Sequence, residues 1–415
     1  MKETMKVAVL GAGLQGIATC LDLAWNKNMS EILIADYELS RAEHVADLCN
    51  KKYGNKVTAK HIDVTDFDAL VALITGYDLV INVTNYYYNI RVMKACLKAK
   101  INYMDLGGLY VESIKQLEMN REFEDAGLLA ITGIGGCSGV TNISAAWAVE
   151  QLDEVEEIHF YCGCDDWSTS TKAFEVSYAI ETIMDEFRMN PIQFIDGAFR
   201  ELEPHANEKM VYYPDPVGPQ LSHNITHSEL GTVPFSFRDR GLKQCTYSIG
   251  FPKEMADRLE FLHLLGFSGR DEIEVDGARV KPVRVLKKLM DGMPDDPNAV
   301  INDCDIILTV VTGYKDGEKI EYTLESICRP VKEWPELMGA QVYIGGASAW
   351  SAELMRRGLI TRKGVCGPEL AVPPLEFFRE AAKREIYVTA RKKFMLGSSD
   401  WEAADRKKKI NQWED

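Results

Sequence analysis

The segment Lys6-Val7-Ala8-Val9-Leu10-Gly11-Ala12-Gly13-Leu14-Gln15-Gly16 decides the fold of this chain. It begins with an apolar run of strand length and continues with glycines at the spacing G-x-G-x-x-G. A helical pattern follows, in which Ile17, Leu21 and Ala24 share one face. Glycines between a strand and a helix allow a sharp turn, and the first N–H groups of a helix have no partner within it. The segment therefore predicts a strand–turn–helix unit with an anion-binding turn.

Apolar runs and helical patterns keep alternating as far as about residue 135. Strands that alternate with helices at this spacing form a parallel sheet with helices on both faces. The expected fold class is therefore α/β, with an N-terminal Rossmann domain, a doubly wound parallel sheet, over residues 1–138. Its strands are expected at residues 6–10, 31–36, 57–63, 79–82, 103–106 and 128–131.

The glycine turn and the strand ends predict a dinucleotide cofactor. The first glycine permits the bend, the second lets a pyrophosphate approach the backbone, and the third lets helix and strand pack closely. Asp36 ends the second strand, where an acidic residue binds the ribose hydroxyls of NAD, and Tyr37 follows it instead of an arginine. We expect NAD, with NADP less favoured although Arg41 is close in sequence. The expected cofactor-binding residues are Gly11, Gly13, Leu14, Gln15, Gly16, Asp36, Asp63, Val64 and Asn82.

The sequence pattern changes after residue 138. Asp276-Gly277 and Asp316-Gly317 each separate two apolar segments, which is typical of β-hairpins. We expect an α+β domain with a mixed sheet over residues 139–344, helices that return to the Rossmann domain over residues 345–396, and a polar tail over residues 397–415.

The composition excludes several kinds of partner. A formal charge of −16 repels nucleic acid and anionic lipid, and the sequence has no apolar run long enough to span a membrane. A cationic amine is compatible with this charge, although a solvated acidic surface explains most of it. The ten cysteines lie mostly in apolar stretches, which is typical of reduced thiols in a cytoplasmic protein.

Further segments, spread from the first strand to near the C-terminus, carry one family pattern. These segments, and their order along the chain, resemble those of the saccharopine dehydrogenase family and, within it, of the lysine 6-dehydrogenase-like branch. The chain departs from the family at Cys137-Ser138-Gly139, where a Pro-Gly pair is usual, and at Cys164. The matching segments are residues 7–13, 78–89, 103–108, 133–142, 161–164, 227–234 and 364–369.

The resemblance implies an NAD(P)-dependent dehydrogenase that oxidises an amine carbon to an imine or runs the reverse reduction. In the lysine 6-dehydrogenase type, the imine hydrolyses and releases ammonia and an aldehyde. The family fold pairs a Rossmann domain, completed by C-terminal helices, with a mixed-sheet domain that binds the substrate and makes the dimer contact. A homodimer that acts on a small amine or amino acid is therefore expected.

An ammonium ion has to lose a proton before its carbon can give up hydride, and its pKa is about 10. His227 stands in a family segment two residues before Glu229, so we expect His227 as acid/base or substrate anchor and Glu229 as its partner. The alternative is that both residues cap the turn before the Pro234 segment. Asp105, at a strand end, and Tyr86, on a loop, are further catalytic candidates, although a turn-forming aspartate and a packing tyrosine are the alternatives.

A substrate amine and a substrate carboxylate both need partners. Asp166 follows the first strand of the second domain and is a candidate for the amine, whereas Arg238 and Arg240 are candidates for a carboxylate clamp. All three are also compatible with an exposed surface position. His223, His227 and Glu229 lack a further strong ligand nearby in sequence, so no metal is expected.

Three hypotheses about activity follow. The first is NAD-dependent oxidative deamination of lysine or a similar amine. The second is a reductive condensation that makes a secondary amine, as in saccharopine or carboxynorspermidine dehydrogenases, which requires room for two substrate halves. The third is a nucleotide-binding protein without catalysis, which the departures at Cys137, Ser138 and Cys164 keep open.

Overall fold

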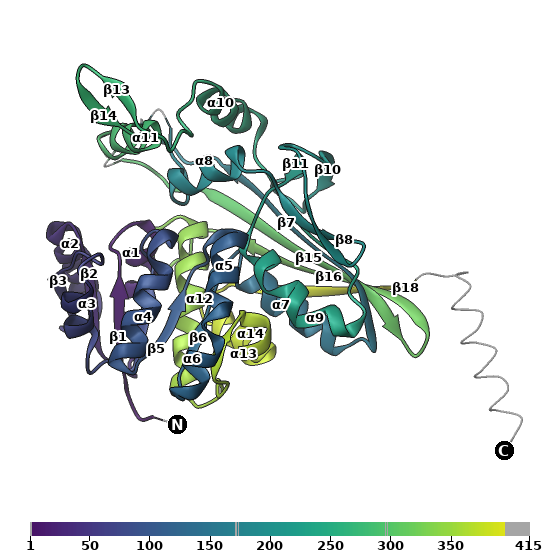
Figure 1. Ribbon diagram of the computed structural model, residues 1–415, viewed down its shortest axis with the longest axis horizontal. Coiled ribbons are helices and arrows are strands. Elements are labelled where there is room, and N and C mark those ends of the chain that lie inside the picture. Colours follow the sequence, from purple (N-terminus) through teal and green to yellow (C-terminus); the bar gives the residue numbers. More distant parts are fainter. Residues whose placement is uncertain (1, 171, 173, 295, 297, 395–415) are drawn as a thin grey trace, which may run out of the picture.

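The fold is described from a computed structural model that covers residues 2–170, 172, 174–294, 296 and 298–394. The expected polar tail over residues 397–415 lies outside the described residues. Figure 1 shows a parallel-sheet domain at the lower left and a long mixed sheet that extends to the right and above it. The expected fold class is confirmed.

Seven parallel strands from the described residues form the first sheet, in the order β17-β6-β5-β4-β1-β2-β3. The order changes direction at β1, so the turn after β1 lies where open α/β sheets bind ligands. The strands are β1 (Met5–Leu10), β2 (Met29–Asp36), β3 (Val57–His61), β4 (Leu79–Asn82), β5 (Asn102–Asp105), β6 (Leu129–Ile131) and β17 (Gly364–Cys366).

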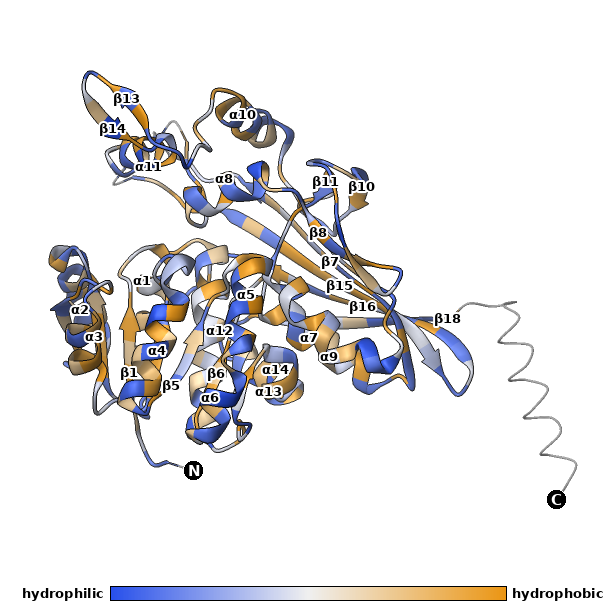
Figure 2. Ribbon diagram, viewed as in Figure 1, coloured by the Kyte–Doolittle hydropathy of each residue, from blue (hydrophilic) through white to orange (hydrophobic). Residues whose placement is uncertain are grey.

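Alternating side chains of β1 serve two cores because successive residues of a strand point to opposite faces. Val7 and Val9 pack in the core beneath α1, α2, α12 and α14, and Ala8 and Leu10 pack in the core beneath α3, α4 and α6. The apolar colour of β1 in Figure 2 reflects this burial on both faces. The helices are α1 (Leu14–Trp25), α2 (Leu39–Tyr53), α3 (Phe67–Ile74), α4 (Asn89–Ala99), α5 (Leu109–Glu118), α6 (Asn120–Asp125), α12 (Gly339–Arg356), α13 (Pro368–Ala371) and α14 (Pro374–Ala382).

The second sheet includes β7 (Glu154–Asp166) as its first strand along the chain, and it contains nine strands within the described part of the chain. Its main path is β10-β11-β12-β7-β15-β16-β18, with β8 and β9 beside β12. Only the β12–β7 pair is parallel among the pairs described, so the sheet is mixed. The other strands are β8 (Ile192–Ile195), β9 (Ala198–Glu201), β10 (Lys209–Tyr212), β11 (Pro219–Asn224), β12 (Gln244–Gly250), β15 (Asp303–Lys315), β16 (Glu318–Cys328) and β18 (Val388–Phe394).

Helices and a small hairpin accompany the mixed sheet, and together with α8, α10 and α11 the hairpin forms the lobe at the top of Figure 1. The two expected hairpins are confirmed: β13 pairs with β14 across Asp276-Gly277, and β15 pairs with β16 across Asp316-Gly317. These elements are α7 (Val140–Glu150), α8 (Ile180–Arg188), α9 (Val233–Phe237), α10 (Lys253–Leu264), β13 (Ile273–Val275), β14 (Ala278–Val280), α11 (Pro282–Asp291) and the short 3-10 helices Tyr86–Tyr88, Ser228–Gly231 and Arg238–Arg240.

The C-terminal region differs from the expected run of helices. It also contributes β17, which pairs with β6 in the parallel sheet, and β18, which pairs with β16 in the mixed sheet. The region from β17 to β18 therefore joins both domains. All ten cysteines lie in the described ranges as free thiols, most of them buried. None of the helices described here is both long and apolar enough to cross a membrane.

Candidate active site

The turn between β1 and α1 has space on its outer side. Gly11 adopts φ 105°, and a Cβ atom there would lie 2.9 Å from the carbonyl oxygen of Val83. A Cβ atom on Gly16 would lie 2.0 Å from the carbonyl oxygen of Gly11. Among the described residues, no atom lies within 4 Å of a Cβ atom placed on Gly13, and no side chain caps the start of α1. The turn therefore fits a dinucleotide, whose pyrophosphate would meet the free N–H groups of α1.

Asp36 lies directly beside this turn. Its carboxylate accepts hydrogen bonds from the N–H groups of Ala12, at 2.7 Å, and Glu38, at 2.8 Å. The end of β2 thus presents a carboxylate where ribose hydroxyls are bound in Rossmann domains. Arg41 is paired with Glu38 at 3.1 Å and with Asp291 of α11 at 3.5 Å, so two carboxylates already share its charge.

The other expected cofactor residues lie along the same edge. Leu14 is exposed at the first position of α1, and the Gln15 side chain donates to the carbonyl oxygen of Ser177 at 3.2 Å. Asp63 follows β3 and accepts from the N–H and hydroxyl of Thr65, whereas Val64 is buried. Parallel strands end at one edge, so these residues frame the space next to the glycine turn.

Asn82 and Asp105 lie side by side at the ends of β4 and β5. Asp105 is buried and accepts from the N–H groups of Gly107 and Gly133, both at 2.8 Å, and from the side chains of Tyr103 and Gln116. Burial raises the pKa of Asp105, and these donors offset part of the rise. Because four donors surround its carboxylate, the geometry favours the role of shaping this turn over direct contact with a substrate amine.

His227 and Glu229 are in contact and almost completely buried. The Nδ1 atom of His227 lies against Glu229, whose other oxygen accepts from the Thr141 hydroxyl at 2.7 Å. The ring of His227 stacks on Tyr247, with ring centroids 4.0 Å apart and planes 8° from parallel. Burial lowers the pKa of His227, but the Glu229 and Glu186 carboxylates outweigh burial and leave this pKa above its ordinary value. Within the described residues, Nε2 of His227 makes no hydrogen bond, so this nitrogen is available to a ligand.

The segment around His227 is fixed to the carboxyl edge of the parallel sheet. The Ser228 hydroxyl accepts a hydrogen bond from the N–H of Gly108, at 3.0 Å, in the turn after β5. The buried Glu369 carboxylate accepts from Asn142 at 2.8 Å and from Ser236 at 2.7 Å. Four segments that are far apart in sequence therefore meet here, and they place His227 near the carboxyl edge of the sheet, where the glycine turn also lies.

Glu186 of α8 is a second buried acid near His227. It accepts a hydrogen bond from the Tyr178 hydroxyl at 2.7 Å. Burial raises the pKa of Glu186 to about 7, against the opposing effects of the His227 charge and the Tyr178 hydrogen bond. A carboxyl group with this pKa exchanges protons at neutral pH, which suits a general acid or base.

Asp185, also on α8, connects the two domains. Its Oδ2 atom accepts from the hydroxyls of Tyr86, at 2.8 Å, and Tyr87, at 2.7 Å, which lie on the loop after β4. Arg270 also donates to Asp185 and stacks on the Tyr87 ring at 5.0 Å. Burial raises the pKa of Asp185, but Arg270 and the two tyrosines outweigh burial and hold it below its ordinary value. An ionised carboxylate on α8 therefore holds the loop of Tyr86 against the outer lobe, which is formed by α8, α10, α11 and the β13–β14 hairpin.

The N-terminal sheet matches a known family. Residues 7–131 match the family model described as the saccharopine dehydrogenase NADP binding domain. The fold of the whole chain is similar to that of the saccharopine dehydrogenase (L-Glu forming) from Saccharomyces cerevisiae. Their TM-score is 0.69 with 16% identity, over 94% of this chain and 100% of the yeast chain.

Two enzymes with established names are similar in sequence over most of their length. Carboxyaminopropylagmatine dehydrogenase from Synechocystis sp. is 25% identical over 334 residues, which covers 78% of this chain and 81% of the relative. Carboxynorspermidine synthase from Vibrio alginolyticus is 26% identical over 339 residues, which covers 76% of this chain and 79% of the relative. The similarity therefore extends beyond the saccharopine dehydrogenase-type Rossmann domain into the mixed-sheet domain.

The three residues expected to bind substrate have partners other than His227, Glu229 and Glu186. Asp166 is exposed at the end of β7 and accepts from the N–H of Ser168. Arg240 donates to the carbonyl oxygen of Leu152, at 2.7 Å, beyond the end of α7, and Arg238 is exposed beside the Phe235 ring. Arg240 thus has backbone partners near α7, whereas Arg238 is exposed, and the carboxylate clamp stays a prediction.

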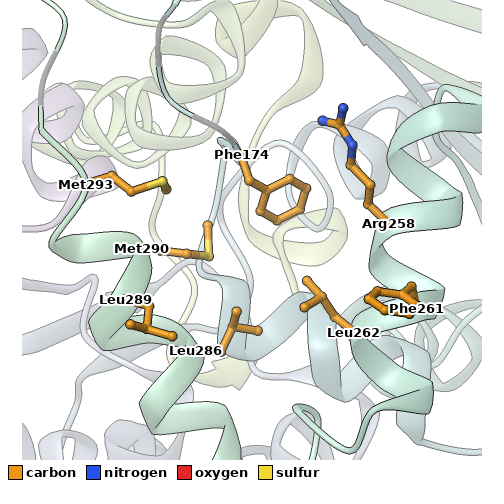
Figure 3. A pocket seen from close by; sticks show the side chains of 8 residues that line it. All are labelled: Phe174, Arg258, Phe261, Leu262, Leu286, Leu289, Met290 and Met293. Carbon is orange, nitrogen blue, oxygen red and sulfur yellow. The ribbon is translucent and has the colours of Figure 1, made fainter.

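A pocket of about 360 Å³ lies in the outer lobe rather than at this edge (Figure 3). Its only charged lining residue, Arg258, pairs with Glu254. Because its lining offers no acid or base, we do not assign the reaction to it. The lining residues are Phe174, Arg258, Phe261, Leu262, Leu286, Leu289, Met290 and Met293.

Asp185 and Glu186 were not expected from the sequence as site residues. They stand in a short amphipathic helix, where charged residues are ordinarily solvent-facing. Both are nonetheless buried, within a segment that also buries Glu181. Three buried carboxylates in one helix are an informative signal, but burial is not readable from one sequence.

Proposed function

We propose that this saccharopine dehydrogenase-like NAD(P)-dependent oxidoreductase catalyses a reductive condensation. In this reaction, the primary amine of a polyamine-like substrate joins an aldehyde that carries a carboxylate, and the resulting imine is reduced to a secondary amine. The observation that carries the proposal is the buried group of His227, Glu229 and Glu186 at the carboxyl edge of the Rossmann sheet. The names of the two similar enzymes support this choice over oxidative deamination of the lysine 6-dehydrogenase type.

The proposed reaction balances with one reduced nucleotide. A primary amine and an aldehyde lose water to form an imine, and a proton and a hydride then reduce the carbon–nitrogen double bond. The products are a secondary amine, water and the oxidised nucleotide. When bound, the reduced nicotinamide supplies the hydride to the imine carbon.

The residues of this chain move the protons. An arriving ammonium ion has a pKa of about 10, so it has to lose a proton before it attacks the aldehyde. We assign this step to His227, whose Nδ1 is held by Glu229 and whose Nε2 faces no partner among the described residues. We assign to Glu186 the proton that is added to the carbinolamine hydroxyl, which then leaves as water and yields the protonated imine. After hydride has reached the imine carbon, the secondary amine takes back the proton that His227 removed from the ammonium ion. Glu186 has a pKa of about 7, and the neighbouring carboxylates raise the pKa of His227 above its ordinary value, so the two groups are suited to complementary acid and base roles.

The charge of the site supports a cationic substrate. Asp185, Glu186 and Glu229 are buried carboxylates close to His227 or to the Tyr86 loop. A chain with a formal charge of −16 also attracts polyamines at long range. These features are consistent with an amine that carries more than one positive charge.

Substrate pairing tests the proposal. We expect NADH or NADPH to be oxidised only when a diamine or polyamine and a carboxylated aldehyde are present together. Release of ammonia from an amine with NAD would instead support oxidative deamination. Tight nucleotide binding without turnover across the full set of pairs would support the non-catalytic hypothesis.

Asp36→Asn is expected to shift the cofactor preference. We propose that the chain prefers NAD(H), because Asp36 is suited to the ribose hydroxyls and Arg41 is already paired with two carboxylates. Loss of one charge-assisted hydrogen bond costs about 1.5 kcal/mol, so we expect the ratio of kcat/KM for NADH over NADPH to fall about tenfold. Asp47→Asn is the matched control, because Asp47 is an exposed aspartate of α2 with no proposed contact to the cofactor. Equal ratios in Asp36→Asn and Asp47→Asn would contradict the assignment.

Glu186→Gln is expected to change the pH dependence of activity and of stability. The pKa of Glu186 is about 7, so its acid form is lost as the pH rises through neutrality, and the alkaline fall in kcat should disappear in the variant. The folded chain holds this proton at pH values where the unfolded chain, with a pKa of about 4.3, has released it. Stability therefore falls as the pH rises between these two pKa values.

Thermal unfolding checks the stability part of this prediction. Glu186→Gln should gain in Tm relative to the parent as the pH is raised from acidic to slightly alkaline. A Tm difference that does not change with pH, together with an unchanged profile of kcat, would show that Glu186 does not titrate in this range.

A further inference from the structure

Two histidines and a glutamate converge at one end of the mixed sheet, away from the His227–Glu229 pair. His205 lies between β9 and β10, Glu208 immediately precedes β10, and His223 lies on β11. One ligand atom from each of the three residues lies within 4.8 Å of those of the other two. The Nδ1 atom of His205 is 3.5 Å from Glu208, and the two imidazole centroids are 4.7 Å apart.

The backbone holds these residues in place. Glu208 and His223 extend the antiparallel register of β10 and β11 by one pair. In the same turn, the side chain of Asn207 donates to the side chain of Asn224 at 3.0 Å. The carbonyl oxygen of Ala206 accepts from the N–H of Asn224 at 3.4 Å. The turn that carries His205 and Glu208 is therefore tied to Asn224, the residue of β11 that follows His223.

His223 has an unmet hydrogen-bonding requirement. Its side chain lies in a residue that is only 8% exposed, and its Nε2 atom has no hydrogen-bond partner among the described residues. The ring of Phe187 contacts His223 and His205 edge-on, with centroid separations of 5.8 and 5.9 Å. A buried polar nitrogen without a partner is destabilising, and here it lies beside a second imidazole and a carboxylate.

We propose that His205, Glu208 and His223 bind one divalent transition-metal ion, for which zinc is the best match. Two imidazoles and a carboxylate are a donor set that zinc prefers, and a fourth position remains for water. From their spacing in the sequence, His223, His227 and Glu229 form a candidate ligand set instead. The structure separates them, because His227 pairs with Glu229 while His223 turns to His205. The ion would crosslink the β9–β10 turn to β11.

Such a crosslink would also stabilise α8, the helix that carries Asp185 and Glu186. Phe187, which packs against both imidazoles, directly follows Asp185 and Glu186 in α8. We therefore assign the ion a structural role: fixing the position of α8. The ion takes no part in the proton transfers assigned above.

Metal titration of the untagged protein tests the proposal. After treatment with a chelator, the protein should bind one Zn²⁺ per chain by calorimetry, and Co²⁺ should give the visible absorption bands of a bound ion. His205→Ala and Glu208→Gln should each weaken Zn²⁺ binding by at least about 100-fold, because each removes a direct ligand. Zn²⁺ should raise the Tm of the parent and leave that of the two variants unchanged.

His44→Ala is the matched control, because His44 is exposed on α2, far from the cluster in the fold. It should retain the affinity of the parent. The proposal is overturned if the chelator-treated parent binds no Zn²⁺, or if His205→Ala and Glu208→Gln bind it as tightly as His44→Ala. The second outcome would place the ion on other residues, such as the free cysteines.

Discussion

His227→Asn should lower kcat for the reductive condensation by about 10²- to 10⁴-fold, the usual contribution of a positioned general acid or base. Asparagine keeps polar atoms near the position of the ring but cannot carry a proton between the substrate and solvent. The affinity for NADH should stay within a factor of about two, since the glycine turn and Asp36 are untouched. Steady-state rates at saturating amine and aldehyde, together with nucleotide titration, measure both quantities.

His159→Asn provides the matched control for His227. His159 also pairs with a glutamate, Glu157 at 3.2 Å, but it lies on β7 and additionally contacts Thr246. This variant should retain the kcat of the parent. Equal rates in His227→Asn and His159→Asn would remove His227 from the reaction and favour its alternative role in capping a turn.

Asp22→Ala should destabilise the protein by about 3 kcal/mol, the effect of leaving a buried charge without its partner. Asp22 on α1 pairs with Arg384, which follows α14, and both side chains are at most 3% exposed. The indole N–H of Trp350 also donates to Asp22, at 2.9 Å. This contact ties the end of the chain to the first helix of the Rossmann domain, so its loss weakens the junction of α1, α12 and α14.

Urea unfolding followed by circular dichroism measures this loss. Asp257→Ala is the control, because Asp257 pairs with Lys253 on the surface, where the two side chains are 60% and 87% exposed. The free energy of unfolding of this control should stay within about 0.5 kcal/mol of the parent. A loss below about 1 kcal/mol in Asp22→Ala would show that Arg384 finds sufficient compensation from Glu380, which it also contacts.

The parallel sheet could be predicted because each part of it has a local signal. Apolar runs mark β1 to β6, and the glycine turn fixes where the sheet binds a nucleotide. The strand β17 had no such signal, because Gly364–Cys366 is short and its flanking glycines favour a turn. The strand β18 is mostly exposed and charged, and it forms only because β16 offers a free edge.

The candidate site could be predicted only where its residues are close in sequence. His227 and Glu229 are neighbours along the chain, so their contact follows from local geometry. Asp185 and Glu186 reach the site through the packing of α8, which no sequence spacing reveals. Asp105 was expected at the sheet edge and does lie there, but the four donors around it depend on residues from separate segments.

Arg238 and Arg240 show that residues close in sequence to a site residue can have partners that the sequence does not predict. They follow the His227 segment closely in sequence, which suggested a carboxylate clamp. Arg240 instead donates to backbone carbonyl groups near the end of α7, and Arg238 lies beside the Phe235 ring of α9. Closeness in sequence to His227 therefore does not identify the partners of these two side chains.

Transfer of deuterium is the most direct test of the proposed reductive condensation. The protein is mixed with a polyamine, a carboxylated aldehyde and NADH or NADPH that carries deuterium at the transferable position, and the products are identified by mass spectrometry. The account predicts a secondary amine that contains one deuterium on the newly formed carbon–nitrogen unit, and no such product when the amine, the aldehyde or the nucleotide is omitted. Ammonia and an aldehyde formed from the amine and NAD alone, with no secondary amine in the complete mixture, would contradict it.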